Sequence, residues 1–372
     1  MKIEPFVVEQ WMNEFENHCK YNLAETCVES LTVSELLEIT GVGRAALDDI
    51  LPMKLTYGDI TGSTRLRTAI AALYEGVRAE NVLVTHGAIG ANKLVHETLI
   101  GPTDRVISVQ PTYQQHYSIP ASYGADVQVL ALRPENRYLP DLDELKSLMS
   151  SDTVLIAINN PNNPTGSLMD TKTLTEIGRI AAEYNTYVLC DEVYRGTDQH
   201  GTGTSAAMAD VYDKGISTGS MSKAFSLAGL RLGWMAAPDE VITAAEIHRD
   251  YSTISIGMIN DFLATIALEH AETILERSRS ITRTNLAILD AWVDAEPRIS
   301  WIKPQSGTTA LLRYDADLTS RYFCEQLLEA TGVLFMPGSA LEAEGHIRIG
   351  YANNEQVLAD GLPRVSHFLQ SL

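Results

Sequence analysis

The chain has 372 residues, and its 48 acidic residues against 28 lysines and arginines give a formal net charge of −20. Because phosphate binding requires clustered cations, this acidity argues against a nucleic-acid partner and against docking on an anionic membrane. Hydrophobic residues make up 45 % of the chain and charged residues 20 %, which is the composition of a globular protein with a sizeable core.

The same composition bears on localisation. No apolar run reaches the roughly 18 residues that a membrane-spanning helix requires. The first 20 residues contain glutamates at positions 4, 9, 14 and 16, whereas a secretory signal is cationic and then apolar. The four cysteines form no CxxC pair, so we expect neither a disulfide framework nor a metal site. We therefore expect a cytoplasmic protein without a membrane partner.

Two helices are predicted near the N-terminus. Val8, Trp11 and Phe15 recur at helical spacing, and a second helix over 32–39 can be capped by its first residue. Residues 41–46 then fit the dinucleotide fingerprint GxGxxA. That fingerprint requires a preceding strand, but a helical stretch precedes it here. We therefore interpret this segment as a helix end followed by a helix start.

From residue 64 onward, strands alternate with helices, which indicates βαβ units and a mostly parallel sheet buried on both faces. The expected strands cover 81–85, 105–110, 128–132, 153–160, 187–192, 215–220 and 233–238, and the expected helices cover 64–76, 88–100, 141–149 and 174–185.

The last third of the chain changes character. Long helices are predicted from about 245 to 294, followed by a strand over 308–314, a helix, a strand over 333–338, a second helix and a strand over 346–352. This order predicts a second, smaller α+β unit. No linker rich in Gly, Pro or Ser separates it from the preceding part.

Polar residues that can carry chemistry follow three of the predicted strands. Asn163, Asp191 and Lys223 lie at the carboxyl ends, where open α/β sheets bind ligands. A phenol, two hydroxyls and a guanidinium accompany them, and these groups suit an aromatic aldehyde that carries a phosphate, a ring nitrogen and a phenolic oxygen. The accompanying residues are Tyr194, Ser220, Ser222 and Arg231.

These motifs resemble the fold type I, pyridoxal-phosphate-dependent enzymes of the class I/II aminotransferase group. The resemblance spans nearly the whole chain, and the Ser-x-Ser-Lys-Ala-Phe-x-x-x-Gly-x-Arg-x-Gly-Trp stretch at 220–234 is highly specific. It implies a large domain over 46–275, with a mostly parallel seven-stranded sheet flanked by helices. It also implies a small α+β domain built from both termini, 1–45 and 276–372.

The resemblance implies pyridoxal 5'-phosphate (PLP) as cofactor and assigns residues to its ring. Lys223 would form the internal aldimine and then shuttle the α-proton. Asp191 would pair with the protonated ring nitrogen, Asn163 and Tyr194 would bond the phenolic oxygen, and Tyr113 would stack on the ring. We expect burial beside cations such as Arg231 to lower the pKa of Lys223 and make it nucleophilic.

The resemblance also implies how the phosphate and the substrate are held. Backbone N–H groups of Gly87 and Ala88, at a helix N-terminus, would bind the phosphate together with Ser220, Ser222 and Arg231. Tyr57 would reach the phosphate of the other subunit in a homodimer with shared active sites. The substrate α-carboxylate would be clamped by Arg348, with Asn163 beside it.

The implied activity is transfer of an amino group between an α-amino acid and a 2-oxo acid. A PLP-dependent lyase or cyclase stays open, because residues 132–145 and 222–234 carry a looser similarity to capreomycidine synthase, an arginine-derived cyclase. An effector-binding domain of a transcription regulator is disfavoured, since the motifs begin too early to leave room for a DNA-binding domain.

One substrate contact is suggested by the loop over 21–30. Glu25 lies there in an otherwise apolar stretch. It can receive a cationic substrate side chain, or it can be solvated or cap the helix that follows. The sequence leaves both interpretations open.

Overall fold

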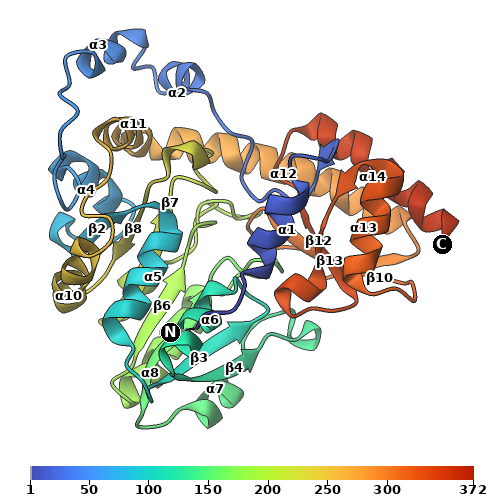
Figure 1. Cartoon of the computed structure of the whole chain (residues 1–372), viewed down its shortest axis with the longest axis horizontal. Helices are drawn as coiled ribbons and strands as arrows, with labels where there is room; N and C mark the ends of the chain where they lie inside the picture. The colour runs from blue at the N-terminus through green and yellow to red at the C-terminus, as the bar shows by residue number, and fades with distance from the viewer. Residues whose placement is uncertain (1) are drawn as a thin grey trace.

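The computed structural model describes residues 2–372, and its largest element is a seven-stranded sheet (Figure 1). The strand order is β2-β8-β7-β6-β5-β3-β4. β8 runs antiparallel to both of its neighbours, and every other pair is parallel. The predicted mostly parallel sheet is thereby confirmed. Its strands are β2 (Val82–Thr85), β3 (Arg105–Gln110), β4 (Asp126–Ala131), β5 (Thr153–Asn159), β6 (Tyr187–Asp191), β7 (Gly215–Ser220) and β8 (Gly233–Ala236).

Helices cover both faces of this sheet. Leu155 and Leu189 point to one face, where they pack in a buried cluster with α5 and α10. Ile156 and Val188, the neighbouring residues, point to the other face and pack with α7 and α8. Because both faces of these strands are buried, the strands are continuous runs of apolar residues. Each fully buried aliphatic side chain stabilises the folded state by roughly 1.5–3 kcal/mol. The helices around the sheet are α4 (Thr64–Ala71), α5 (Gly87–Leu99), α6 (Gln115–Tyr123), α7 (Leu142–Leu148), α8 (Thr171–Glu183), α9 (Met208–Val211), α10 (Asp239–Asp250) and α11 (Met258–Glu269).

The register of the central strands aligns their carboxyl ends. Asn159, Asp191 and Thr218 are direct partners across β5, β6 and β7. The segments that leave these strands therefore begin at one edge of the sheet. Asn163 and Lys223 lie on two of those segments.

A second sheet holds the C-terminal part of the chain. Its antiparallel order is β12-β13-β10-β9, and a short β1 (Tyr21–Asn22) pairs in parallel with β11 (Val333–Leu334). Trp11 packs in the same buried cluster as Phe335 and donates its Nε1–H to the Phe335 carbonyl at 2.9 Å. The other elements here are β9 (Ile299–Trp301), β10 (Thr309–Tyr314), β12 (Met336–Pro337), β13 (His346–Gly350), α1 (Val7–Phe15), α12 (Ala271–Ala295), α13 (Ser320–Thr331) and α14 (Glu355–Ser371).

This shared cluster supports a division of the chain, which we retain as a proposal: a large domain over 46–275 and a small domain over 1–45 and 276–372. One observation qualifies the first boundary. Leu36, in the helix α2 (Val33–Ile39), packs with Leu66 and Ile70 of α4, so α2 contacts the core of the proposed large domain.

The C-terminal tail differs from the prediction in three places. The strand expected over 333–338 is divided into β11 and β12, which belong to different sheets. The helix expected between residues 338 and 346 is only a four-residue 3₁₀ turn, Gly338–Leu341, which ends at Glu342 with a positive φ. The helix α14 was not predicted, although Leu358, Leu362, Val365 and Leu369 recur at helical spacing and are buried.

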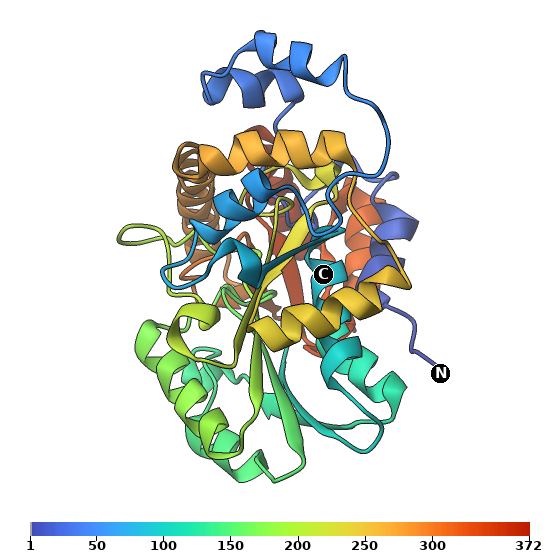
Figure 2. The same cartoon turned by 90° about the vertical axis from the view of Figure 1, so that its left-hand side faces the viewer.

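The N-terminal segment between α2 and α4 extends away from the body of the molecule (Figure 1, Figure 2). Thr32 caps α2 with a reciprocal capping box, as its sequence indicates. The GxGxxA segment follows this helix and contains a 3₁₀ turn, Arg44–Ala46, before α3 (Leu47–Ile50). The element directly before it is the helix α2 and not a strand, so its interpretation as a helix end and start is confirmed.

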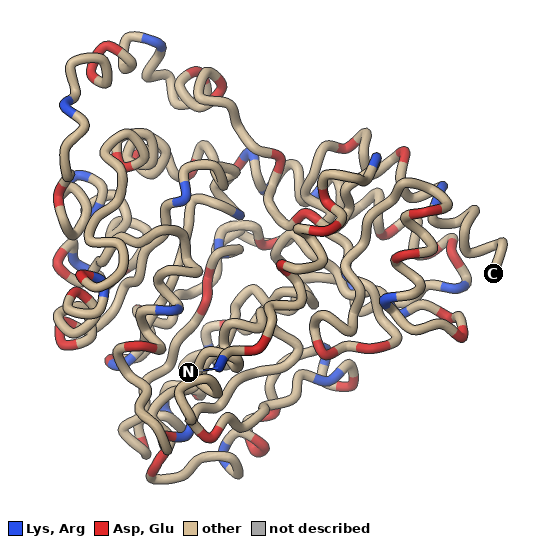
Figure 3. Tube along the Cα trace, in the orientation of Figure 1, with Lys and Arg blue, Asp and Glu red and all other residues tan. Residues whose placement is uncertain are grey.

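The distribution of acidic residues and the polarity of the helices agree with what the composition predicts. Asp and Glu are spread along the whole trace (Figure 3). Within residues 2–372, every helix is too short or too polar to cross a membrane.

One close approach between sheet and helix yields a stability prediction. A Cβ added at Gly233 of β8 would overlap backbone atoms of Gly87 and Ala88, whereas a Cβ at Gly229 would meet nothing within 4 Å. We expect Gly233→Ala to lower the free energy of unfolding by about 1–3 kcal/mol through overpacking. Gly229→Ala is the matched control. Thermal unfolding of both variants checks this, and equal midpoints would contradict it.

Candidate active site

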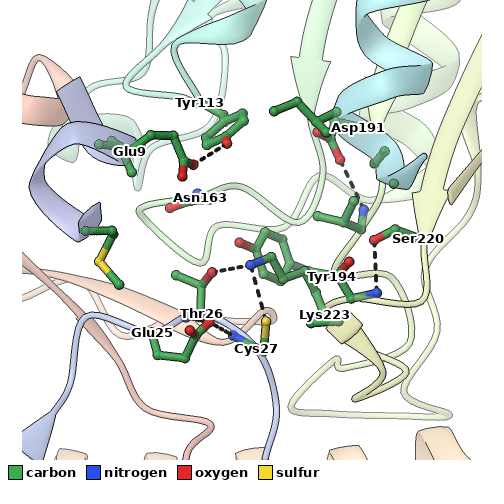
Figure 4. A pocket seen from close by; sticks show the side chains of 18 of the residues that line it. Glu9, Glu25, Thr26, Cys27, Tyr113, Asn163, Asp191, Tyr194, Ser220 and Lys223 are labelled. Atoms are coloured by element: carbon green, nitrogen blue, oxygen red, sulfur yellow. Dashed lines mark hydrogen bonds between the residues drawn. The ribbon is translucent and has the colours of Figure 1, made fainter. Parts of the chain in front are cut away.

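A cavity of about 460 Å³ lies beyond the aligned strand ends and is also lined by α1 (Figure 4). It brings together every predicted site residue except Tyr57. The residues collected there are Glu25, Gly87, Ala88, Tyr113, Asn163, Asp191, Tyr194, Ser220, Ser222, Lys223, Arg231 and Arg348.

Lys223 is contacted from a distant part of the sequence. Its Nζ donates to Thr26 Oγ1 at 2.6 Å and lies 3.5 Å from Cys27 Sγ. Burial lowers the pKa of Lys223, but the nearby Cys27, Tyr194 and Glu25 outweigh burial and raise it above its usual value. The expected lowering beside Arg231 is therefore wrong, because residues of the 21–30 loop dominate the surroundings of this lysine.

Asp191 is buried and fixed through both carboxylate oxygens. Oδ2 accepts a hydrogen bond from Asn92 Nδ2 at 2.8 Å, and Oδ1 accepts one from the Val193 N–H at 3.2 Å. Asn92 is held in turn by Thr218 Oγ1 at 2.7 Å. His116 Nε2 lies 3.6 Å from Oδ2. The carboxylate is thus oriented by neighbours before any ligand binds.

The guanidinium of Arg348 is almost fully buried, with 2 % of the residue exposed. Nη1 donates to Asn163 Oδ1 at 3.1 Å, and Nη2 donates to the Ala24 carbonyl at 2.9 Å. Nε has no partner among the described residues. A buried charged donor without a partner is costly, so this cavity suits a ligand that carries an anionic group.

A cradle for a second anion lies at the N-terminus of α5. The cap residue His86 makes no side-chain bond to the first N–H groups of the helix. Gly87 has φ +70°, and a Cβ there would come within 3.1 Å of Arg231 Nη2. Glycine therefore lets the guanidinium of Arg231 approach the exposed N–H groups. A helix N-terminus beside a guanidinium suits a phosphate.

Two tyrosines complete the cavity (Figure 4). Tyr113 donates its OH to Glu9 Oε1 of α1 at 2.6 Å. Tyr194 is buried, and burial raises the pKa of its phenol despite the opposing charges of Lys223 and Arg348.

Tyr57 does not join these residues. It is 73 % exposed and lines a different cavity, of about 430 Å³, with Met258 and Asp261. Sequence reasoning also missed Thr26, Cys27 and Asn92. A polar Asn92 on the buried face of a predicted apolar helix was the one available signal.

Comparison with known proteins identifies the family. Residues 35–362 match the sequence profile described as aminotransferase class I and II. The chain belongs to this family. Its enzymes depend on PLP, which is therefore the cofactor of this protein.

Individual relatives of this class I/II protein include transaminases and cyclases. Capreomycidine synthase from Streptomyces vinaceus is 31 % identical over 366 residues, which are 97 % of this chain and 93 % of that protein. A PLP-dependent aminotransferase from Streptococcus suis 89-1591 superposes with a TM-score of 0.97 at 42 % identity, covering 100 % and 99 % of the two chains. The PLP-dependent cyclase OrfR superposes with a TM-score of 0.91 at 28 % identity, covering 100 % and 98 %.

The anchored carboxylate of Asp191 gives a prediction. Asp191→Asn keeps the size of the side chain but removes its buried negative charge from the cavity. We expect turnover to fall by about 10²- to 10³-fold, the range for one preorganised electrostatic group. Steady-state rates at saturating PLP measure this. Turnover within about threefold of the parent would show that the charge is not needed.

Proposed function

We propose that this protein is an aminotransferase that moves an amino group between an α-amino acid and a 2-oxo acid. The observation that carries the proposal is the sharing of one cavity by Lys223 and the buried, partly unpaired guanidinium of Arg348. A lysine amine and a carboxylate-binding fork are the two groups that amino-acid chemistry on this cofactor requires of the protein.

The donors and acceptors of the cavity fit PLP, which supplies an electron sink when bound. Asp191 would hold a proton on the ring nitrogen. Asn163 and Tyr194 would donate to the phenolic oxygen, and Tyr113 would cover the ring face. The backbone of Gly87 and Ala88, with Ser220, Ser222 and Arg231, would hold the phosphate.

The remaining groups act on the substrate. Arg348 would bind the α-carboxylate with its guanidinium fork, and its bond to Asn163 would orient that fork. Lys223 would bind the cofactor through Nζ, then accept the α-proton at Nζ and return it. A positioned base of this kind contributes roughly 10²- to 10⁴-fold to the rate.

A PLP-dependent lyase or cyclase is the second candidate. The similarity to capreomycidine synthase over 97 % of this chain favours it, as does the likeness to the cyclase OrfR. Both candidates would use Lys223, Asp191 and Arg348 in the same roles, so they would differ in product and not in the core of the site.

The primary test uses the PLP-loaded enzyme. Borohydride reduction should attach the cofactor to the peptide that contains Lys223, as read by mass spectrometry, and the Lys223→Ala variant should remain unlabelled. With ¹⁵N-labelled amino acids and pyruvate as acceptor, an aminotransferase yields ¹⁵N-alanine and a 2-oxo acid.

Three outcomes would contradict this proposal in different ways. Label on another lysine would remove the assignment of Lys223. Released ammonia, or a cyclic product that retains the ¹⁵N, would replace transamination by the second candidate.

We also propose a homodimer with shared sites. Apolar side chains in and near the protruding N-terminal segment are largely solvent-exposed in one chain, and a second copy would cover them. They include Leu51 at 82 %, Leu55 at 79 %, Tyr57 at 73 % and Tyr251 at 92 % exposure. Tyr57 would then reach the phosphate bound in the other subunit.

Subunit exchange tests this sharing. We expect inactive Lys223→Ala and weakened Tyr57→Ala chains to regain activity when mixed, because each heterodimer then combines Lys223 of one chain with Tyr57 of the other. Activity before and after exchange is compared, with exchange verified by native mass spectrometry of differently tagged chains. No gain after verified exchange would place Tyr57 outside the partner's site.

A further inference from the structure

The cavity has an acidic wall that the proposed chemistry does not use. We define this acidic wall as Glu9, Glu16 and Glu25, all of which line the cavity. Glu9 lies on α1, Glu16 directly follows that helix, and Glu25 comes from the loop after β1. Figure 4 shows Glu9 and Glu25 together with Lys223.

Glu25 lies between the two groups that would bind the ends of an amino acid. The residue before it, Ala24, accepts a hydrogen bond from Arg348 through its carbonyl at 2.9 Å. The residue after it, Thr26, contacts Lys223 Nζ at 2.6 Å. A substrate with its carboxylate on Arg348 and its α-carbon near Lys223 therefore has Glu25 close to its side chain.

The carboxylate of Glu25 is oriented and ionised. Its Oε1 accepts backbone N–H bonds from Thr26 at 2.8 Å and Cys27 at 2.9 Å. Burial alone raises the pKa of Glu25, but the Lys223 ammonium and these bonds lower it below the usual value. Lys223 must be neutral to accept a proton, and the Glu25 carboxylate then loses its compensating cation.

In the proposed function, the other cations of the cavity would face anions of the cofactor and the substrate. Arg231 lies at the phosphate cradle and Arg348 at the α-carboxylate position. Among the described residues, three cationic side chains line the cavity, namely these two arginines and Lys223. The buried, unpaired Nε of Arg348 marks the same space as a ligand site independently of the glutamates.

We propose that the amino-acid substrate carries a cationic side chain, a guanidinium or a primary ammonium, and that Glu25 is its main partner within the acidic wall. This inference rests on the proposed function for the placement of the α-carboxylate. Ion pairing between Glu25 and the substrate would restore the charge balance that Lys223 gives up when it acts as a base.

Spectral titration of the PLP-loaded enzyme tests the inference without relying on turnover. The probes are two matched pairs, L-arginine with L-citrulline and L-lysine with L-norleucine, in which only the cationic group is replaced or removed. We expect the cationic member of at least one pair to change the cofactor absorption at a half-saturating concentration about 10- to 100-fold lower than its neutral partner.

Glu25→Gln should reduce that ratio to within about threefold and leave the neutral probe unaffected. Glutamine keeps an oxygen that can accept both backbone bonds, so the loop is preserved, and an unchanged unfolding midpoint verifies this. Glu14→Gln is the matched control, because Glu14 lies on α1 but faces Arg321 at 3.8 Å, outside the cavity.

The outcomes separate this inference from the proposed function. Equal or stronger binding of the neutral probes, or equal losses for both members of a pair in Glu25→Gln, would overturn the inference alone. Selective binding of L-arginine without ¹⁵N transfer would contradict transamination and leave the inference standing. No spectral response to any of the four probes would overturn the inference alone, because the ¹⁵N assay with other amino acids tests the proposed function separately.

Discussion

The buried guanidinium of Arg348 is the interaction on which the geometry of the site depends. It lies on β13 of the small sheet and donates hydrogen bonds to Asn163, on the segment that follows β5 of the large sheet, and to the carbonyl of Ala24. The loop that supplies Thr26 and Glu25 is thereby tied to the aligned ends of β5–β7. The cavity exists because three segments that are distant in the sequence converge on one charged group.

In this cavity, the local charge favours a kind of ligand that the net charge of the chain disfavours. A net charge of −20 disfavours the binding of extended polyanions, yet the helix N-terminus beside Arg231 suits a single phosphate. The same cavity also contains the acidic wall of Glu9, Glu16 and Glu25. Cofactor and substrate would therefore be sorted by their charged ends, with anionic groups directed to the two guanidiniums and cationic groups to the carboxylates.

Much of the fold could be predicted from the sequence, because its strands are buried on both faces and such strands are continuous apolar runs. The positions of Asp191 and Lys223 followed from the rule that ligands bind at strand ends. The surroundings of Lys223 did not follow, since Thr26 and Cys27 reach it from almost 200 positions away. The 3₁₀ turn at Gly338–Leu341 is too short for periodicity to define. Tyr57 is a different case, because its proposed role depends on a second copy of the chain, and within one chain it lies outside the cavity.

The pairing of β1 with β11 has a consequence for biosynthesis. Tyr21 lies opposite Val333, and Trp11 bonds Phe335 across 324 positions. The segment with Trp11 and Tyr21 therefore leaves the ribosome more than 300 positions before its partners are made. Closing so long a loop early is entropically unfavourable, and domains generally fold as units in the order in which they are synthesised. The seven-stranded sheet is therefore expected to form first, while α1 waits as an unpaired amphipathic helix that requires protection until the chain is complete.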